Sequence, residues 1–542
     1  MKKAMKKLMA ALLAVAMVCA MAIPAFAAGG TTAAAATGTN TLTIHGTTEG
    51  HTYEAYQVFK GTLNSSDVLS DIQWGDGVDG DGILKDTGLP SSLSGLSSAA
   101  TLAAKLEGLG DGSDDVNTFA KVVSKYIKGT AKHISSASGK TYTISNLPDG
   151  YYFIKDATDN MPDGATYSRY MLNIVKSMEI NAKDTSVTLD KQIYHNDTES
   201  WGVVGDNQIG DTVEFRTITT VPDTTGYTDY TYEIHDTMST ELTSNVKDAS
   251  DITIKVGDAL TSPVLASTYY TVTASGNTFT VSVKIIDAVN AGVLHANDKL
   301  YTYYTGVLNE TAKVYPNGPQ DNEAHLVYSN NPTAGGTGKT PEKKVYDWTF
   351  KVDVTKVDGT DHNKTLKGAV FALTGTSGVT LNPDANGDLT DADKSKLIKL
   401  IANADGSYTV APKDYTGTVT YTMTTPDNGQ ISIKGLDDNA EYYLHETKAP
   451  DGYNTLTEPV KFKVNKLDNN AYGNDGLTIS ATPTVKFNDT DSTSLAFNVK
   501  NNRGTTLPGT GGIGTTIFYV VGGGLMVAAG VLLITKKRME NR

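Results

Sequence analysis

Cysteine is almost absent from this sequence. The 542 residues contain one, Cys19, which lies in an apolar segment near the N-terminus. A chain with a single cysteine forms no internal disulfide, so the cross-link that commonly reinforces exported proteins is excluded. Helical repeats and heptads are missing as well. Any covalent reinforcement of this chain must therefore use other side chains.

Basic residues are outnumbered by acidic ones. The chain has 46 Lys and Arg against 60 Asp and Glu, a net charge of −14. This balance argues against nucleic acid as a partner and predicts a soluble, self-repelling surface. The nine histidines form no H-E-x-x-H motif, and no G-x-S-x-G nucleophile motif occurs. We therefore predict that the chain is not a turnover enzyme and uses no cofactor.

Recognisable metal motifs are also lacking. Residues 384–395 begin like a calcium loop, but Leu389 replaces the turn glycine and Ser395 stands where a bidentate glutamate belongs. Residues 76–82 are acidic without the required spacing. The sequence predicts solvated loops at both places and no metal site.

Long apolar runs occur only at the two ends. Four lysines precede apolar residues 8–22, and Ala25-Phe26-Ala27 supplies the small residues of a cleavage site, which predicts a signal peptide over 1–27. Near the C-terminus, an apolar run predicts a transmembrane helix over 514–535, followed by a basic cytoplasmic tail over 536–542. The chain is thus expected to be exported and held by one span.

A pentapeptide just ahead of this span resembles the LPxTG signal of sortase substrates. It consists of Leu507, Pro508, Gly509, Thr510 and Gly511. The resemblance implies that a sortase cuts between Thr510 and Gly511 and passes the Thr510 carbonyl to an amine. The membrane would then hold the chain only transiently, and the product would be secreted and anchored to the peptidoglycan cell wall.

Between the two ends the residue pattern is typical of β-structure. Short alternating runs rich in Tyr, Thr and Val are separated by Gly, Asn and Asp, which predicts a mainly β protein of about three domains of ~150 residues each. We place these domains at 28–182, 184–345 and 346–505, with residues 330–344 as a hinge. The first domain is expected to hold strands at 42–45, 53–59, 142–144, 151–154 and 170–175 and one helix capped by Ser113.

In the third domain, three expected strands each carry one polar residue on an otherwise apolar face. Lys356 follows Phe350, Val352 and Val354; Asn501 follows Leu495, Phe497 and Val499; Glu446 follows Tyr442 and Leu444. Each could alone be a solvated strand end, since Lys, Asn and Glu are mostly exposed. The shared parity instead indicates that all three face one interior.

These segments resemble the B-type collagen-adhesin modules of Gram-positive pilins. The likeness rests on "VTKVDG", "LKGAVFALTG", "YYLHETKAPDGYN" and a Val-x-Asn strand ahead of LPxTG. It implies an isopeptide bond between Lys356 and Asn501, with Glu446 as the proton shuttle. An apolar pocket suits this chemistry because burial lowers the pKa of an amine and raises that of a carboxyl group. Contact between the groups makes the reaction unimolecular.

The middle domain repeats the pattern with aspartate as the acid. Lys191, Asp236 and Asn330 share the apolar face of their expected strands, with Asn331 as the alternative to Asn330. The stretch "YEIHDTMSTELT" resembles A-type, aspartate-assisted isopeptide domains of pilus backbones. In the first domain, Asp156 follows Tyr152 and Ile154 on one strand face, like the acidic residues of the other two domains. No lysine and asparagine with matching parity lie on flanking strands, so we expect no cross-link there.

Taken together, the resemblance is to sortase-assembled pilus backbone subunits built of tandem immunoglobulin-like β-sandwich domains, the first with a helical insertion. It implies that Thr510 is joined to a lysine of the next identical subunit. Lys183 stands where the family has that lysine, although Asn181-Ala182 replaces Tyr-Pro, and Lys176 is the next candidate. Accessory pilins and host ligands are further possible partners. The alternative is a monomeric LPxTG-anchored adhesin that binds a host matrix protein or glycan.

Overall fold

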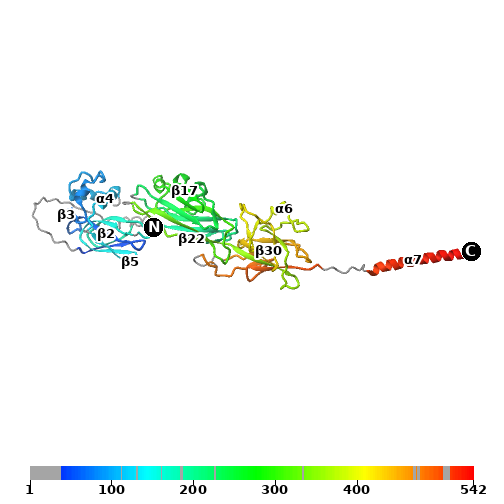
Figure 1. Ribbon diagram of the computed structural model, residues 1–542. Helices are drawn as coiled ribbons and strands as arrows, with labels where there is room; N and C mark the ends of the chain where they lie inside the picture. The colour runs from blue at the N-terminus through cyan, green and yellow to red at the C-terminus, as the bar shows by residue number, and fades with distance from the viewer. Residues whose placement is uncertain are drawn as a thin grey trace, which may run out of the picture.

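The computed structural model describes residues 38–541, except 111–112, 130–131, 160, 183–186, 225–226, 332–334, 468–471, 473–475 and 505–512. The predicted signal peptide, Lys183 and the pentapeptide at 507–511 lie outside the described residues. Figure 1 shows three β units that follow one another along the molecule, with a C-terminal helix beyond the third. The mainly β, sandwich-type fold class predicted from the sequence is confirmed.

The first unit packs two sheets against each other. One sheet has the order β5-β6-β1-β9, and the other has the order β3-β2-β7-β8 with β4 on β2. Buried Leu42, Ile44, Tyr53 and Tyr142 lie between them. The strands are β1 (Asn40–His45), β2 (Tyr53–Leu63), β3 (Leu69–Trp74), β4 (Lys132–Ile134), β5 (Ser136–Ser138), β6 (Thr141–Leu147), β7 (Gly150–Asp156), β8 (Arg169–Ile174) and β9 (Met178–Asn181).

Helices cover one side of this unit. The predicted helix is α4 (Asp114–Lys125), and the Ser113 side chain accepts from the Val116 N–H at 3.4 Å, as expected for its cap. The sequence reasoning missed α2 (Gly80–Lys85) and α3 (Ala99–Glu107). Helix α3 begins with a capping box between Ser98 and Thr101. Its small and polar residues gave little periodic signal.

The middle unit also has two sheets. They have the orders β11-β10-β13-β19-β15, with β16 on β19, and β12-β22-β20-β14-β18-β17, with β21 on β20. The elements are β10 (Leu189–His195), β11 (Ser200–Gly202), β12 (Val204–Asp206), β13 (Thr212–Thr220), β14 (Tyr232–Met238), β15 (Leu242–Ser244), η1 (Ala249–Asp251), β16 (Thr253–Val256), η2 (Ser267–Tyr269), β17 (Tyr270–Ser275), β18 (Thr278–Val283), α5 (Ile285–Asn290), β19 (Lys299–Leu308), β20 (Gln320–Ser329), β21 (Thr337–Lys339) and β22 (Lys343–Trp348).

The segment 330–344, expected to be a hinge, contributes residues 337–339 and 343–344 to strands of the middle sheet. Strand β21 pairs with the C-terminal end of β20, and β22 pairs with its N-terminal end. Strands β21 and β22 therefore follow each other along β20 in the same direction. The middle unit therefore continues to Trp348, and the change to the third unit occurs at Thr349.

The third unit has sheets of order β25-β26-β28-β23-β33 and β27-β24-β29-β30-β31-β32. Its core is continuous with that of the middle unit, because one buried apolar cluster extends from Val187 to Val499. The elements are β23 (Phe350–Asp358), β24 (Val370–Thr374), α6 (Asp391–Lys394), β25 (Leu400–Ala402), β26 (Tyr408–Val410), β27 (Met423–Thr424), β28 (Gln430–Leu436), β29 (Tyr442–Lys448), β30 (Val460–Val464), β31 (Val485–Phe487), β32 (Thr490–Asp491) and β33 (Ala496–Asn501).

The C-terminal helix α7 (Ile513–Glu540) contains the predicted membrane span. Within residues 517–540, an 18-residue window has a mean hydropathy of 2.4, and none of that window is buried against the β units. Its length and composition suit a bilayer crossing.

Candidate cross-linking sites

Strands β23, β29 and β33 bring the three predicted polar residues of the third unit together. Strands β23 and β33 are parallel neighbours, with Asp358 opposite Asn501 and Lys356 two pairs earlier, on the same face. Glu446 comes from β29 in the facing sheet. The side chains of Lys356 and Glu446 are completely buried, and Asn501 is 1% exposed. All three therefore occupy one closed interior, as their parity indicated.

The polar atoms of this group are in direct contact. The Lys356 ammonium donates to the Asn501 side-chain oxygen and lies 2.9 Å from Glu446 Oε1. The Asn501 amide nitrogen donates to both oxygens of Glu446 at 3.0 Å and to the Asn454 carbonyl at 3.0 Å. The Leu456 N–H fixes Glu446 Oε2 at 2.8 Å. Glu446 thus touches both the amine and the amide.

Apolar surroundings make the lysine easier to deprotonate. Burial lowers the pKa of Lys356, and the charge and hydrogen bond of Glu446 oppose that shift. The amine also lies 5.3 Å from the centre of the Phe371 ring. A neutral amine beside a carboxamide whose nitrogen is held by a carboxylate is suited to acyl transfer, because Glu446 can carry a proton from one nitrogen to the other.

In the middle unit, Lys191 and Asp236 form a second buried pair. The Lys191 ammonium donates to Asp236 Oδ2 and to the Tyr304 hydroxyl, and this hydroxyl also donates to Asp236. Both charged side chains are completely buried. Burial lowers the pKa of Lys191 and raises the pKa of Asp236, while each partner opposes the shift of the other. Tyr304, on β19, was missed by the sequence reasoning.

Asn330, the asparagine predicted for this site, is not at it. On β20, Ala324 is the residue opposite Asp236. Asn330 lies six positions beyond Ala324, just after the end of the strand. Six residues of strand span about 20 Å. The Asn330 carbonyl instead accepts from the Tyr167 N–H of the first unit at 2.9 Å. The parity was right, but the position along the strand was wrong.

Asn322 lies on the same face of β20 beside Asp236. It is opposite Met238, the next residue of β14 on that face, and it is fully buried. Burial raises the pKa of Asp236 and of Tyr304, and the Asn322 side chain is close enough to both to oppose that rise. Within the described residues, neither polar atom of Asn322 makes a hydrogen bond of good geometry. Asn322 lies eight residues before Asn330 and on the same strand face, so strand alternation alone would have made it a candidate.

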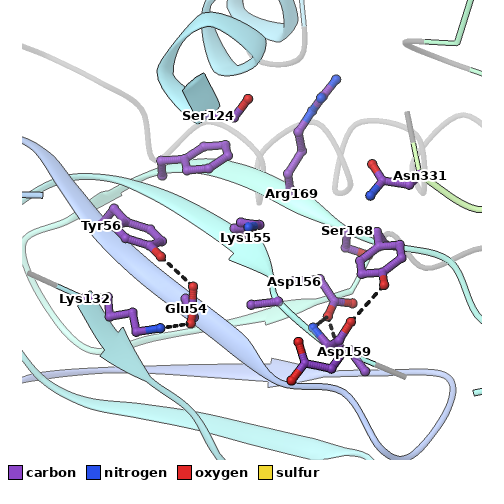
Figure 2. Close-up of a pocket in the computed structure, with 14 residues that line it drawn as sticks. Glu54, Tyr56, Ser124, Lys132, Lys155, Asp156, Asp159, Ser168, Arg169 and Asn331 are labelled. Carbon is purple, nitrogen blue, oxygen red and sulfur yellow. Dashed lines mark hydrogen bonds and ion pairs between the residues drawn. The ribbon is translucent and has the colours of Figure 1, made fainter. Parts of the chain in front are cut away.

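In the first unit, Asp156 has a histidine as its partner. Asp156 Oδ2 lies 2.6 Å from His51 Nδ1, and its Oδ1 accepts from Thr158. Figure 2 shows Asp156 at one side of a polar cavity of about 590 Å³, with Lys155 and Arg169 lining it as well. The prediction that this unit lacks a cross-link remains a prediction.

Of the candidate acceptor lysines, only Lys176 is described. It is exposed in the turn between β8 and β9. Lys183 follows β9 in the chain and lies outside the described residues, as do Leu507–Gly511.

Comparisons with known proteins give two family matches. Residues 350–475 match the SpaA prealbumin-like fold domain, and residues 499–541 match the LPXTG cell wall anchor motif. The trypsin-resistant surface T6 protein of Streptococcus pyogenes serotype M6 is 27% identical over 269 residues, covering 43% of this chain and 48% of that protein. The chain thus spans about half the length of this relative in the match.

Solved structures of pilins are also similar. The T6 backbone pilin of S. pyogenes has a TM-score of 0.49 and 20% identity, with coverage of 86% of this chain and 99% of that one. The major pilin SpaD of Corynebacterium diphtheriae has a TM-score of 0.45 and 18% identity, with coverage of 86% and 98%. The anchor motif and the T6 relative confirm the predicted resemblance and the cell-wall-anchored surface location.

Proposed function

We propose, from the premise that this wall-anchored chain carries a prealbumin-like domain of the SpaA type, that it is the backbone subunit of a covalently polymerised pilus. The observation that carries the proposal is the buried contact of Lys356, Glu446 and Asn501 in a chain without disulfides. A fibre subunit must resist pulling, and covalent bonds inside each domain supply that resistance. The protein is a structural substrate of sortase and not a turnover enzyme.

The proposed bond in the third unit forms by transamidation. The neutral Lys356 amine attacks the Asn501 side-chain carbonyl carbon, and Glu446 takes the proton that the amine loses. Glu446 then delivers this proton to the departing Asn501 nitrogen, which leaves as ammonia. One C–N bond forms and one breaks, so no oxidant or cofactor is required. Enclosure holds the reactants together and replaces a slow bimolecular reaction by a unimolecular one.

In the middle unit we propose that Lys191 is joined to Asn322, with Asp236 as the proton shuttle. Burial of Asn322 beside Asp236 and Tyr304 supports this choice over Asn330. Since β10 and β20 belong to different sheets, the bond would tie the two sheets together.

Polymerisation is proposed to join Thr510 of one subunit to Lys183 of the next. Co-expression of the chain with its sortase should give a ladder of high-mass species in cell-wall extracts, and Lys183→Ala should abolish it. Lys176→Ala is the matched control and should leave the ladder unchanged. Monomer-sized protein alone in the wild-type extract would refute the polymer, and a ladder that persists in Lys183→Ala would refute the acceptor.

A monomeric anchored adhesin is the second candidate. The observation that favours it is the polar cavity of the first unit, which is lined by both cations and carboxylates. Such a cavity could hydrogen-bond a glycan or an acidic peptide. Binding of the mature chain to collagen and glycan arrays, abolished by Arg169→Ala, together with the absence of a ladder, would favour the adhesin.

A further inference from the structure

Three aspartates from different segments converge where the middle and third units meet. Asp197 lies in the turn after β10, Asp206 ends β12, and Asp438 follows β28. One carboxylate oxygen from each lies within 4.8 Å of the other two. Asp206 and Asp438 are 1% and 0% exposed. The first two belong to the middle unit and the last to the third unit.

These carboxylates have fewer hydrogen bonds than buried polar groups normally make. Among the described residues, Asp197 Oδ2, Asp206 Oδ1 and Asp438 Oδ1 have no hydrogen-bond partner. Two of the other oxygens are engaged: Asp438 Oδ2 accepts from the Leu467 N–H at 2.7 Å, and Asp206 Oδ2 accepts from the Tyr472 hydroxyl at 3.3 Å. Buried oxygens without donors are rare and call for an explanation such as an ion.

A histidine points into the same place. His195, the last residue of β10, is 2% exposed, and its Nε2 lies 3.1 Å from Asp206 Oδ2. Neither ring nitrogen makes a hydrogen bond of good geometry with any described residue. A buried imidazole that contacts a carboxylate of the group but makes no well-formed hydrogen bond is a second and independent sign of a missing ligand.

The described cations nearby do not pair with the cluster carboxylates. Lys466 donates to the backbone carbonyl of Asp197 at 3.1 Å and is itself exposed. Two more aspartates, Asp347 and Asp437, are buried close by. Unpaired buried carboxylates are costly unless a cation compensates them.

We infer that Asp197, Asp206 and Asp438 bind one divalent cation at the junction of the middle and third units, with His195 beside it. Three carboxylates favour a hard cation, and Ca²⁺ is the expected occupant in an extracellular setting. Mn²⁺ and Zn²⁺, which accept an imidazole nitrogen more readily, are the alternatives that the experiment separates. No sequence motif indicates this site, because its ligands are widely spaced along the chain.

The consequence would be a cation-dependent stiffening of the junction. Direct contacts between the two units already exist: the Ile209 N–H donates to the Gly435 carbonyl at 3.1 Å, and Trp348 Nε1 donates to the Gly476 carbonyl at 3.1 Å. An ion held by both units adds a bond that depends on cation concentration. The inference does not rest on pilus assembly or on cross-linking.

The test is calorimetric titration of the EDTA-treated mature chain with CaCl₂, MnCl₂ and ZnCl₂ in separate arms. We expect one binding site per wild-type chain. Asp438→Asn should weaken Ca²⁺ affinity by about 100-fold or more, because losing a direct ligand lowers metal affinity at least as much as losing a residue that only positions a ligand. Saturating Ca²⁺ should also raise the melting temperature of the wild-type chain. Asp384→Asn, in the loop that only resembles a calcium motif, is the control and should bind like wild type.

Two results would overturn the inference. One is the absence of binding by any of the three ions at millimolar concentration. The other is binding of unchanged affinity in Asp438→Asn. Asp206→Asn provides a second variant, and circular dichroism of each variant checks that it is folded. Because Glu446→Gln should bind the ion like wild type, failure of cross-linking and failure of ion binding can be distinguished.

Discussion

Glu446→Gln should abolish the bond in the third unit while keeping the shape of the site. Glutamine retains the size and one oxygen of glutamate but cannot take the proton from the Lys356 amine. The mature wild-type chain should weigh about 17 Da less than its sequence for each bond formed, since each releases one ammonia. Intact-mass spectrometry of the variant should show one such loss fewer.

The effect on stability follows from the size of the closed loop. Lys356 and Asn501 are 145 positions apart. The chain-entropy model for a cross-link of this length gives about 5 kcal/mol of stabilisation. For a domain of this size, a loss of that magnitude lowers the melting temperature by about 10–20 °C. Scanning calorimetry of the mature chain would measure this change in the transition of the third unit.

A matched control separates the missing bond from altered packing. Lys351 lies on the same strand and is partly exposed, with Asp353 as its partner at 3.0 Å. Lys351→Met should retain the full mass loss and nearly the wild-type melting temperature, because exposed ion pairs contribute little. The reasoning is refuted if Glu446→Gln loses as much ammonia as wild type, or if wild type has its unaltered theoretical mass.

Three further outcomes are expected. Asn322→Ala should remove one ammonia loss and Asn330→Ala none, so intact masses of the two variants decide between them; the opposite pattern would restore the sequence prediction. In Glu446→Gln, the free Lys356 amine keeps a depressed pKa in the folded state, so over a range of pH only the unfolded state binds its proton. The free energy of unfolding measured in urea should therefore rise with pH up to the normal lysine pKa near ~10.4. The double variant with Lys356→Met should lack this rise, and an equal rise in both would contradict the assignment. Ser113→Ala should destabilise the first unit by about 1 kcal/mol through loss of its helix cap, as measured by thermal unfolding, whereas no change would exclude a role for the cap.

Strand parity was enough to predict the cluster of the third unit. Lys356, Glu446 and Asn501 each continue an apolar face, and alternation fixes which side of a sheet such a residue occupies. What parity does not fix is the position along a strand. Asn322 and Asn330 share one face of β20, and only the pairing of β14 with β20 distinguishes them. That register depends on contacts between strands far apart in the sequence.

Other features had no local signal at all. The hinge expected at 330–344 contains glycine and proline, which are as typical of tight turns between paired strands as of linkers. The group of Asp197, Asp206 and Asp438 forms only because β12 and the end of β28 meet across two units. Tyr304 occupies one of the alternating buried positions of β19, where an aromatic residue is typical of an ordinary core. Tertiary packing alone gives these residues their neighbours.

The parallel pairing of β23 and β33 determines how the third unit carries load even before any bond forms. Force from the preceding unit enters at Phe350, the start of β23, and force from the anchor enters after Asn501, the end of β33. Since the strands run in the same direction through six register pairs, the two forces slide them past each other lengthwise. Their hydrogen bonds must then rupture together in shear, whereas peeling would break them one at a time.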